Sequence, residues 1–98
     1  TFFIKNYKKN FLVDFFLFKE NNKTFCFAEE YDSNLKKGKI VCLSLINNSL
    51  KDKKTIIDEK FHLSFPFIFK FNNKIFMCPD TSQISEIRLY ICIKGFFS

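Results

Sequence analysis

Several carboxylates and a single histidine are the side chains in this sequence that could bind or act on a ligand. Glu29, Glu30 and Asp32 form an acidic cluster where a strand-like segment ends. Carboxylates in such a place can accept hydrogen bonds from sugar hydroxyls, and an ordinary solvated loop would have the same composition. His62 could contact a sugar hydroxyl or hydrogen-bond the backbone of a neighbouring structural unit. Two hydroxyl side chains are weaker candidates for the same kind of contact: Thr81 and Ser82.

The sequence predicts neither a metal site nor a cofactor. A lone histidine cannot build a metal cluster, and the four cysteines form no Cys-x-x-Cys pair. No Gly-rich phosphate loop, nucleophile elbow or Cys–His pairing occurs. All four cysteines lie inside apolar strand-like segments, where cysteine behaves as a small hydrophobe: Cys26, Cys42, Cys78 and Cys92. We expect buried free thiols and a reducing compartment such as the cytoplasm, although an even count would permit two disulfides in a secreted chain.

Length, composition and charge narrow the class of protein. The 98 residues allow one small domain at most, and the contents of 47% hydrophobic and 27% charged residues fit a globular chain. The longest apolar stretch, Phe61 to Phe69, falls well short of the roughly 20 residues that span a membrane as a helix. The net charge of +6 comes from lysines scattered through turns, with Arg88 as the only arginine, so we expect no nucleic-acid binding.

The residue composition and the first residue carry little information about function. The 16 phenylalanines and the excess of lysine, asparagine and isoleucine are typical of drift in an AT-rich genome. The first residue is Thr, so we expect the native start to lie upstream.

Strand-like segments prevail, and no segment shows a helical stripe with capping residues. Asn21-Asn22 and Asn72-Asn73 fall where tight hairpins are expected, because asparagine tolerates the positive φ of such turns. The predicted strands are rich in aromatic or β-branched residues: Phe15 to Lys19, Thr24 to Ala28, Lys39 to Leu45, Lys54 to Ile57, Phe65 to Phe71, Ile75 to Cys78 and Glu86 to Ile93.

The chain repeats itself. Residues 16–19 reappear as 67–70 and residues 21–23 as 72–74, both at an offset of 51 (67 − 16 and 72 − 21), and Glu29 falls on Asp80 at the same offset. Residues 39–43 match 86–90 in pattern at an offset of 47 (86 − 39). A constant offset over successive turns and strands predicts a structural repeat.

A period near 50 residues with about four strands per unit is typical of a β-propeller. We therefore predict an all-β chain of two tandem four-stranded antiparallel meanders, the blades of an incomplete propeller forming a single partial domain over residues 1–98. The first repeat covers about residues 11–60 and the second about 61–98, where a clear fourth strand is lacking. The remaining blades would then be partners of this piece, which would be marginal alone. A small sandwich or incomplete barrel is the rival all-β prediction.

One string in each repeat carries a family resemblance. In the second repeat it runs from His62-Leu63-Ser64-Phe65-Pro66 through Phe76-Met77-Cys78-Pro79-Asp80-Thr81-Ser82 to Glu86-Ile87-Arg88-Leu89-Tyr90. In the first it runs from Asp14-Phe15-Phe16-Leu17-Phe18 through residues 27–32 to Gly38-Lys39-Ile40. Over residues 11 to about 92 the chain resembles the N-terminal propeller domain of the glucosamine inositolphosphorylceramide transferases and their bacterial relatives.

The resemblance also implies a five-bladed propeller similar to that of glycosidases, and with it a catalytic pair. In those glycosidases an Asp opening the innermost strand acts as general base or nucleophile, and Asp14 takes this place. Asp80 stands where the family has Glu after Pro79 and is the candidate partner acid. Glycosidase carboxylates lie about 5 Å apart for retention or about 6.5–9.5 Å for inversion. Otherwise Asp14 accepts backbone N–H groups and Asp80 starts a turn. Phe15 replaces the usual Pro, and residues 94–98 do not look like a fourth strand.

The function that follows is a carbohydrate-associated propeller, accessory to a glycan- or glycolipid-modifying transferase. Its ligand would be a carbohydrate or glycolipid, and its partner an adjoining catalytic domain or the remaining blades. A glycoside hydrolase-like propeller with paired carboxylates and a kelch-like protein-interaction propeller are the alternatives. The scarcity of glycine counts against the kelch type.

Overall fold

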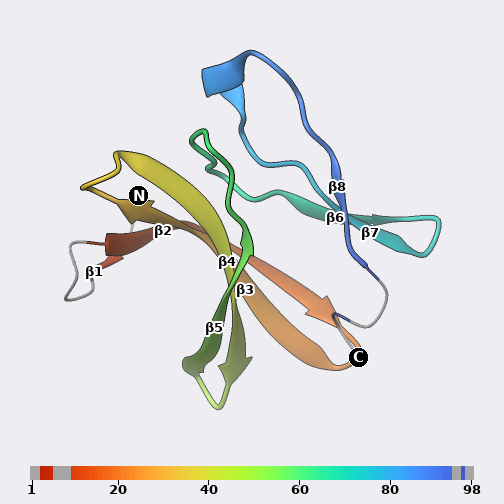
Figure 1. Cartoon of the computed structure of the whole chain (residues 1–98). Coiled ribbons are helices and arrows are strands. Elements are labelled where there is room, and N and C mark those ends of the chain that lie inside the picture. The colour runs from red at the N-terminus through yellow and green to blue at the C-terminus, as the bar shows by residue number, and fades with distance from the viewer. Residues whose placement is uncertain (1–2, 6–9, 94–95, 97–98) are drawn as a thin grey trace.

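The computed structural model of the chain describes residues 3–5, 10–93 and 96, which form two antiparallel β-sheets (Figure 1). The first sheet runs in chain order: β1 (Phe3–Lys5), β2 (Asn10–Glu20), β3 (Lys23–Asp32), β4 (Lys37–Ile46) and β5 (Ser49–Ile57). The second sheet contains three short strands: β6 (Ile68–Phe71), β7 (Lys74–Met77) and β8 (Tyr90–Ile91). A 3₁₀ turn, η1 (Ser82–Ile84), lies between β7 and β8.

The all-β class is confirmed, and so is an antiparallel meander over β2 to β5. The strands of the first sheet are longer than predicted, and β1 at its edge was not predicted. In the second sheet β6 and β8 are shorter than predicted, while β7 has the predicted length and starts one residue earlier. β6 begins only at Ile68, because Pro66 has no N–H for a ladder and Phe65 has a φ of 48° that breaks the extended backbone. Neither sheet closes on itself over the part of the chain that the structure describes.

Asparagine pairs form the tight turns between neighbouring strands. Asn21 and Asn22 have φ angles of 53° and 61°, and Asn72 and Asn73 have 50° and 62°, which confirms the two predicted hairpins. A third pair, Asn47-Asn48, makes the β4–β5 turn with φ angles of 50° and 65° and was not predicted. Positive φ at both central residues is the geometry whose twist matches that of the flanking strands.

The two sheets pair their strands in the same register. Phe18 opposes Phe25 in the first sheet, and Phe69 opposes Phe76 in the second, each 51 residues on. The β3–β4 pairing of Cys26 with Leu43 returns as Met77 with Tyr90, at offsets of 51 and 47. The sequence repeat therefore corresponds to a repeat of strand pairing across these three strands.

A β-bulge recurs at the same place in the repeat. In β2 the register shifts between Val13 and Phe16, and Asp14 has a φ of 55°. The Val13–Glu29 pair before this bulge returns as an isolated bridge between Ser64 and Asp80. Asp14 was expected to open its strand, but β2 begins at Asn10 and Asp14 lies within it, because residues Asn10 to Val13 already pair with β3.

The main core lies between the two sheets, and a smaller core lies on the far face of the first sheet. The main core contains Phe25, Phe27, Ile40, Cys42, Leu63, Ile68 and Met77. The smaller core contains Leu12, Cys26, Ala28, Val41 and Leu43, with Phe15 and Leu50 packed against it. Successive residues of a strand point to opposite faces, so alternation along β3 and β4 supplies both cores. Each large apolar side chain buried in this way contributes about 1.5–3 kcal/mol.

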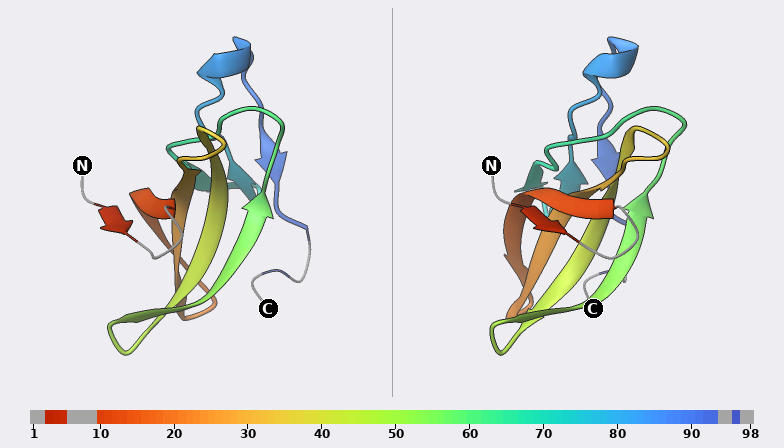
Figure 2. Two further views of the ribbon diagram at one scale, coloured as in Figure 1. Left: turned by 60° about the vertical axis from the view of Figure 1, so that its left-hand side comes forward. Right: turned by 90° about the vertical axis from the view of Figure 1, so that its left-hand side faces the viewer.

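The connection from β5 to β6 crosses one end of both sheets and is fixed to the start of β4 (Figure 2). Lys37 Nζ lies 2.8 Å from Asp58 Oδ1 and also donates to the carbonyl oxygen of Glu59. The backbone N–H of Leu63 donates to the carbonyl oxygen of Gly38 across 3.0 Å. These contacts hold the end of the first sheet and the entry to the second sheet together.

The same connection is fixed to the second sheet by aromatic and charged side chains. The Tyr90 hydroxyl donates to Glu59 Oε2 across 2.6 Å, and the Arg88 guanidinium lies 5.0 Å from the centre of the Phe61 ring. Burial and the hydrogen bond to Glu59 raise the pKa of Tyr90. The ring of Phe96 packs against the main core, while Lys94, Gly95, Phe97 and Ser98 lie outside the described residues. The part of the chain that the structure describes contains no helix long and apolar enough to cross a membrane.

Candidate functional site

Three of the residues singled out in the sequence come together where β3 ends and β4 begins. Glu29 on β3 contacts Asp14 at the bulge of β2, and its Oε2 lies 3.7 Å from Nε2 of His62. Glu29 is 4% exposed, Asp14 is half-buried, and the His62 side chain is 31% exposed. We call Asp14, Glu29 and His62 the polar cluster.

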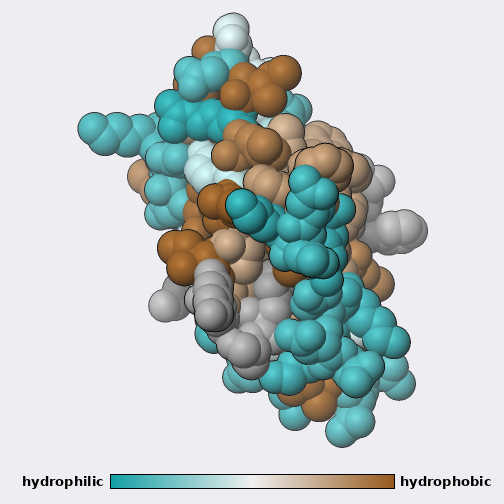
Figure 3. Space-filling model, turned by 90° about the vertical axis from the view of Figure 1, so that its right-hand side faces the viewer, coloured by the Kyte–Doolittle hydropathy of each residue, from teal (hydrophilic) through white to brown (hydrophobic). Residues whose placement is uncertain are grey.

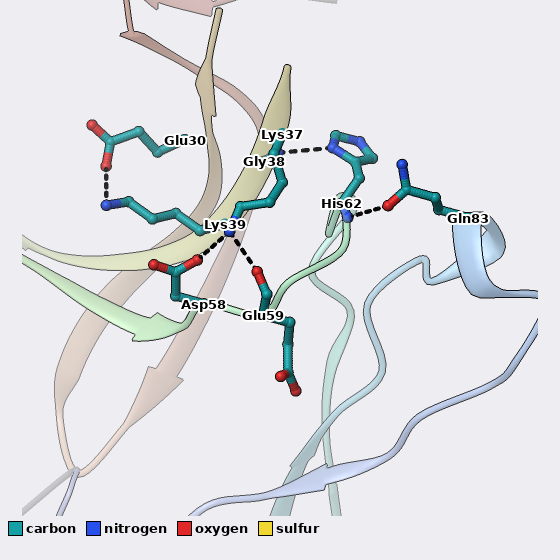
Figure 4. Close-up of polar contacts among 8 residues, drawn as sticks. All are labelled: Glu30, Lys37, Gly38, Lys39, Asp58, Glu59, His62 and Gln83. Carbon is teal, nitrogen blue, oxygen red and sulfur yellow. Dashed lines mark hydrogen bonds and ion pairs between the residues drawn. The ribbon is translucent and has the colours of Figure 1, made fainter. Parts of the chain in front are cut away.

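Gly38 gives the polar cluster its shape. A Cβ atom added at this position would lie 2.5 Å from both Glu29 Oε2 and the Leu63 carbonyl oxygen, so only glycine leaves room for them. The backbone N–H of Gly38 donates to Nδ1 of His62 across 2.8 Å (Figure 4). A neutral imidazole that accepts at Nδ1 carries its proton on Nε2, which faces Glu29. The Tyr31 ring packs edge-on against the imidazole with centroids 6.0 Å apart.

The acidity of Glu29 is altered by this setting. Burial raises its pKa to about 7, and the negative charge of Asp14 and a hydrogen bond with Asp14 act in the same direction. Two carboxyl groups that share a hydrogen bond need one proton between them, because two carboxylates can only accept. Around neutral pH the polar cluster therefore contains a proton that can be exchanged or donated.

Glu30, the next residue, lies on the opposite face of β3 and behaves in the opposite way. Burial alone would raise its pKa, but a 2.8 Å hydrogen bond from Lys53 and contacts with Asn10 and Lys39 outweigh burial and lower the pKa. Figure 4 shows Glu30 reaching Lys39 on the far side of the sheet from His62. Glu30 is thus a buried carboxylate whose negative charge is balanced by Lys53 and Lys39. It is not part of the polar cluster.

The other predicted residues lie in the segment around η1. Asp80 is exposed, and its Oδ1 accepts the backbone N–H of Ser82 across 2.8 Å, which is the contact of a turn-initiating Asp. Thr81 is buried and donates its hydroxyl to the Glu86 carbonyl oxygen. Ser82 begins η1 and is exposed. Asp80 pairs with Ser64 as Glu29 pairs with Val13, so the two acidic residues hold matching positions in the two repeats. The side chain of Asp14 contacts Glu29 and not Asp80.

Three residues near His62 were not identified from the sequence. Gln83 of η1 accepts the backbone N–H of His62 at Oε1 across 2.6 Å, which places η1 beside the polar cluster. Gly38 and Tyr31 also contact the histidine. One sequence signal pointed to Gly38, because it is one of only two glycines in the chain. No comparable signal marked Tyr31 or Gln83, whose partners lie about 20 to 30 residues away.

An apolar groove lies elsewhere in the part of the chain that the structure describes. It has a volume of about 390 Å³ and opens between β5 and the second sheet, with a lining that includes Ile56, Ile75, Tyr90 and Ile93. No member of the polar cluster lines it. Among the described residues no group of three or more His, Cys, Asp and Glu side chains could hold a metal ion.

Comparison with known proteins gives one family. The family model described as "Glucosamine inositolphosphorylceramide transferase 1, N-terminal" matches residues 3–97. The chain is similar to glucosamine inositolphosphorylceramide transferase 1 of Oryza sativa subsp. indica, with 37% identity over 90 residues, 90% of this chain and 12% of the relative. It is similar to the protein of the same name from Arabidopsis thaliana, with 32% identity over 83 residues, 83% of this chain and 11% of the relative. No solved structure matches it.

Proposed function

The chain belongs to the family of the N-terminal region of glucosamine inositolphosphorylceramide transferase 1, and from this membership we propose that it is an accessory part of a glycolipid-modifying transferase. The chain spans about 12% of the length of the rice relative, so the catalytic region would lie in other sequence. In this proposal the polar cluster recognises the carbohydrate part of the substrate. The observation that carries it is the convergence of Asp14, Glu29 and His62 from three separate segments.

The chemistry of the polar cluster suits sugar hydroxyls. A hydroxyl both donates and accepts a hydrogen bond, and here an exposed imidazole edge and a half-buried carboxyl flank a buried carboxyl. Gly38 holds the imidazole through Nδ1, and Gln83 holds the backbone N–H of the same residue, so little rotamer freedom of the ring would be lost on binding. The Tyr31 ring beside His62 adds an apolar surface of the kind that packs against a sugar ring.

The accessory role accounts for the carboxyl geometry better than hydrolysis does. The carboxyl group of Glu29 contacts that of Asp14, whereas a retaining glycosidase keeps its two carboxylates roughly 5 Å apart around the bond that it cleaves. Asp80, which the family resemblance offered as the acid, uses its carboxylate to accept the Ser82 N–H. Recognition needs only the hydrogen bonds of these groups and no gap between two carboxylates.

The proposal extends to the architecture. We regard the two sheets as successive copies of one repeat, the blades of a propeller like the five-bladed domain that the resemblance implies. Strand register, the β-bulge and the asparagine turn recur at a constant offset, which supports this arrangement. The polar cluster would then lie at the end of a blade, where the connection to the next blade begins.

Glycan-array binding by the full-length protein tests the proposed ligand class. Glu29→Gln keeps the size of the side chain and removes the exchangeable acid, and His62→Ala removes the imidazole. Glu20→Gln is the matched control, because Glu20 is a carboxylate paired with Lys70 at a hairpin outside the polar cluster. We expect both cluster variants to lose at least about tenfold in affinity for glycans bearing amino sugar or inositol phosphate, with the control unchanged. Equal binding by all four proteins, or none by a folded wild type, would remove the polar cluster as a carbohydrate site.

A further inference from the structure

The two faces of the second sheet differ in what covers them. The inner face packs against the main core with Ile68, Met77, Ile75, Tyr90 and Cys92. Because successive residues of a strand point to opposite faces, the residues between them lie on the outer face. There Phe69 opposes Phe76, and Phe76 opposes Ile91. We define the outer face by the residues Phe69, Phe71, Phe76, Leu89 and Ile91.

The outer face is mostly apolar: three of its five defining side chains are exposed, Phe69 and Phe76 are half-buried, and Lys74 lies opposite Phe71. Phe71 is 63% exposed, Leu89 58% and Ile91 53%, and the neighbouring Ile87 and Ile93 are 86% and 81% exposed. The space-filling view from the side of the β6–β7 hairpin shows apolar surface gathered in its upper half (Figure 3). Monomeric proteins rarely leave a continuous patch of large apolar side chains in water, so such a patch marks an interaction site.

The matching face of the first sheet is covered by the second sheet. At the offset of 51, Phe69 and Phe76 correspond to Phe18 and Phe25 (69 − 18 and 76 − 25). Phe25 is 9% exposed, and Phe18 packs beside it in the main core, because the second sheet covers this face of the first. Phe25 is therefore buried in the first sheet, whereas Phe76 at the matching position in the second sheet is only half-buried.

We propose that the outer face is the docking surface for the sheet of a third repeat of the same polypeptide, whose inner face resembles that of the second sheet. The occupant would present aliphatic and aromatic side chains where the second sheet has Ile68, Ile75 and Met77. This inference rests on the proposal that the chain is one segment of a longer transferase, and it does not depend on carbohydrate binding.

A second copy of this chain is the poorer occupant. The face that covers a partner sheet, the inner face with Ile68, Ile75 and Met77, is already packed against the first sheet within each copy. A neighbouring repeat of the same polypeptide brings a fresh inner face at high effective concentration. The family relatives have the length to supply one, since the matched segment is 12% of the rice relative.

Thiol labelling of the full-length protein tests the proposal. In Ile91→Cys a small apolar side chain replaces the aliphatic side chain on the outer face, and Leu35→Cys is the control, because Leu35 is 67% exposed in the β3–β4 turn and outside the outer face. Maleimide labelling is read peptide by peptide, which separates the new thiol from the native cysteines. We expect Ile91→Cys to label at least about tenfold more slowly than Leu35→Cys. Equal labelling rates would overturn the proposal.

A dilution series and a second variant keep the outcome decisive. Protection that disappears as the protein is diluted from dimer to monomer would mean that a second copy is the occupant, and it would also overturn the proposal. Leu89→Cys should show the same protection as Ile91→Cys if a whole sheet covers the face, while protection of one position alone would contradict it. Adding a glycan that the protein binds should leave both labelling rates unchanged. The labelling test can therefore fail while the glycan array succeeds, and the glycan array can fail while the labelling test succeeds.

Discussion

Gly38 donates its backbone N–H to Nδ1 of His62 across 2.8 Å, and its carbonyl oxygen accepts the N–H of Leu63 across 3.0 Å. Gly38, near the start of β4, is thus held by two hydrogen bonds from the connection between the sheets, one to its N–H and one to its carbonyl oxygen. Glu29 fills the space that a side chain at Gly38 would need. The packing of the two sheets and the shape of the polar cluster therefore depend on the same residue.

Gly38→Ala should destabilise the protein by about 1–3 kcal/mol, the usual cost of overpacking. The added methyl group would lie 2.5 Å from a backbone oxygen, which cannot move aside as a flexible side chain can. Urea unfolding measures the loss. Combining Gly38→Ala with Glu29→Ala should cost less than the two single changes together, because Glu29 supplies part of the clash. A free energy of unfolding within about 0.5 kcal/mol of wild type for Gly38→Ala would contradict the packing described here.

The polar cluster predicts a specific pH dependence of stability. The pKa of Glu29 is about 7 in the folded chain and has an ordinary value of 4.5, so between these values the folded state holds a proton that the unfolded state has released. Stability from this group is complete below about pH 4.5 and falls as the pH rises through 7. Glu29→Gln should remove on the order of 2–3 kcal/mol of that dependence. Melting temperatures at several pH values between 4.5 and 8 measure it.

Glu30 supplies the contrast for that experiment. Its pKa is lowered because the attraction of Lys53, Asn10 and Lys39 outweighs burial, so its stabilising effect is present above the ordinary pKa and is lost as the pH falls. Glu30→Gln should lower stability at pH 7 and flatten the profile only on the acid side. If Glu29→Gln and Glu30→Gln gave profiles of the same shape, the opposite settings of these two side chains would be wrong.

Phe65 offers a gain in stability. Its φ of 48° costs a bulky residue about 1–2 kcal/mol, and its side chain is 60% exposed, so little packing offsets that cost. The matching position in the first sheet is Asp14, a residue type that tolerates this conformation (65 − 14 = 51). Phe65→Asn should raise the free energy of unfolding by about 1 kcal/mol. Phe67→Asn, two residues on and without a positive φ, should give no gain, and a gain there of equal size would mean that φ is not the cause.

The buried thiols should resist alkylation. Burial, followed by the charge of Cys26, raises the pKa of Cys42 to about 12, with Lys54 acting weakly in the other direction. At pH 8 its thiolate fraction is then on the order of a thousandfold smaller than in the unfolded chain. Iodoacetamide labelling followed by mass spectrometry should show Cys42 and Cys26 modified only after denaturation. Labelling of Cys42 at the same rate before and after denaturation would contradict its burial.

Local patterns explain why part of the fold could be predicted. The hairpins at Asn21-Asn22 and Asn72-Asn73 depend on residues adjacent in sequence, and the offset of 51 needs only that neighbouring strands pair in order. The edge strand β1 could not be predicted in this way, because three residues carry too little pattern. The late start of β6 at Ile68 follows from Pro66 and the positive φ of Phe65, whose effect on pairing depends on the register of the partner strand.

The site shows the limit of reasoning from a family pattern. Asp14, Glu29 and His62 were each identified as candidates, but the family resemblance paired Asp14 with Asp80, which corresponds to Glu29 one repeat later. Correspondence under a repeat places two residues at equal positions in different sheets, and it does not place them side by side. The true neighbour of Asp14 is set by the pairing of β2 with β3 inside one sheet, which brings it to Glu29.

The strand order has a consequence for how the protein is made. Within each sheet every strand pairs with its neighbours in sequence, so the first sheet can assemble as soon as residues up to Ile57 have left the ribosome. Phe16, Phe18 and Phe25 then remain exposed to solvent until β6 to β8 have been synthesised and cover them. During synthesis this aromatic face is the part of the nascent chain that a chaperone would bind, and a pause in translation just after Ile57 would lengthen the time during which the chain can aggregate.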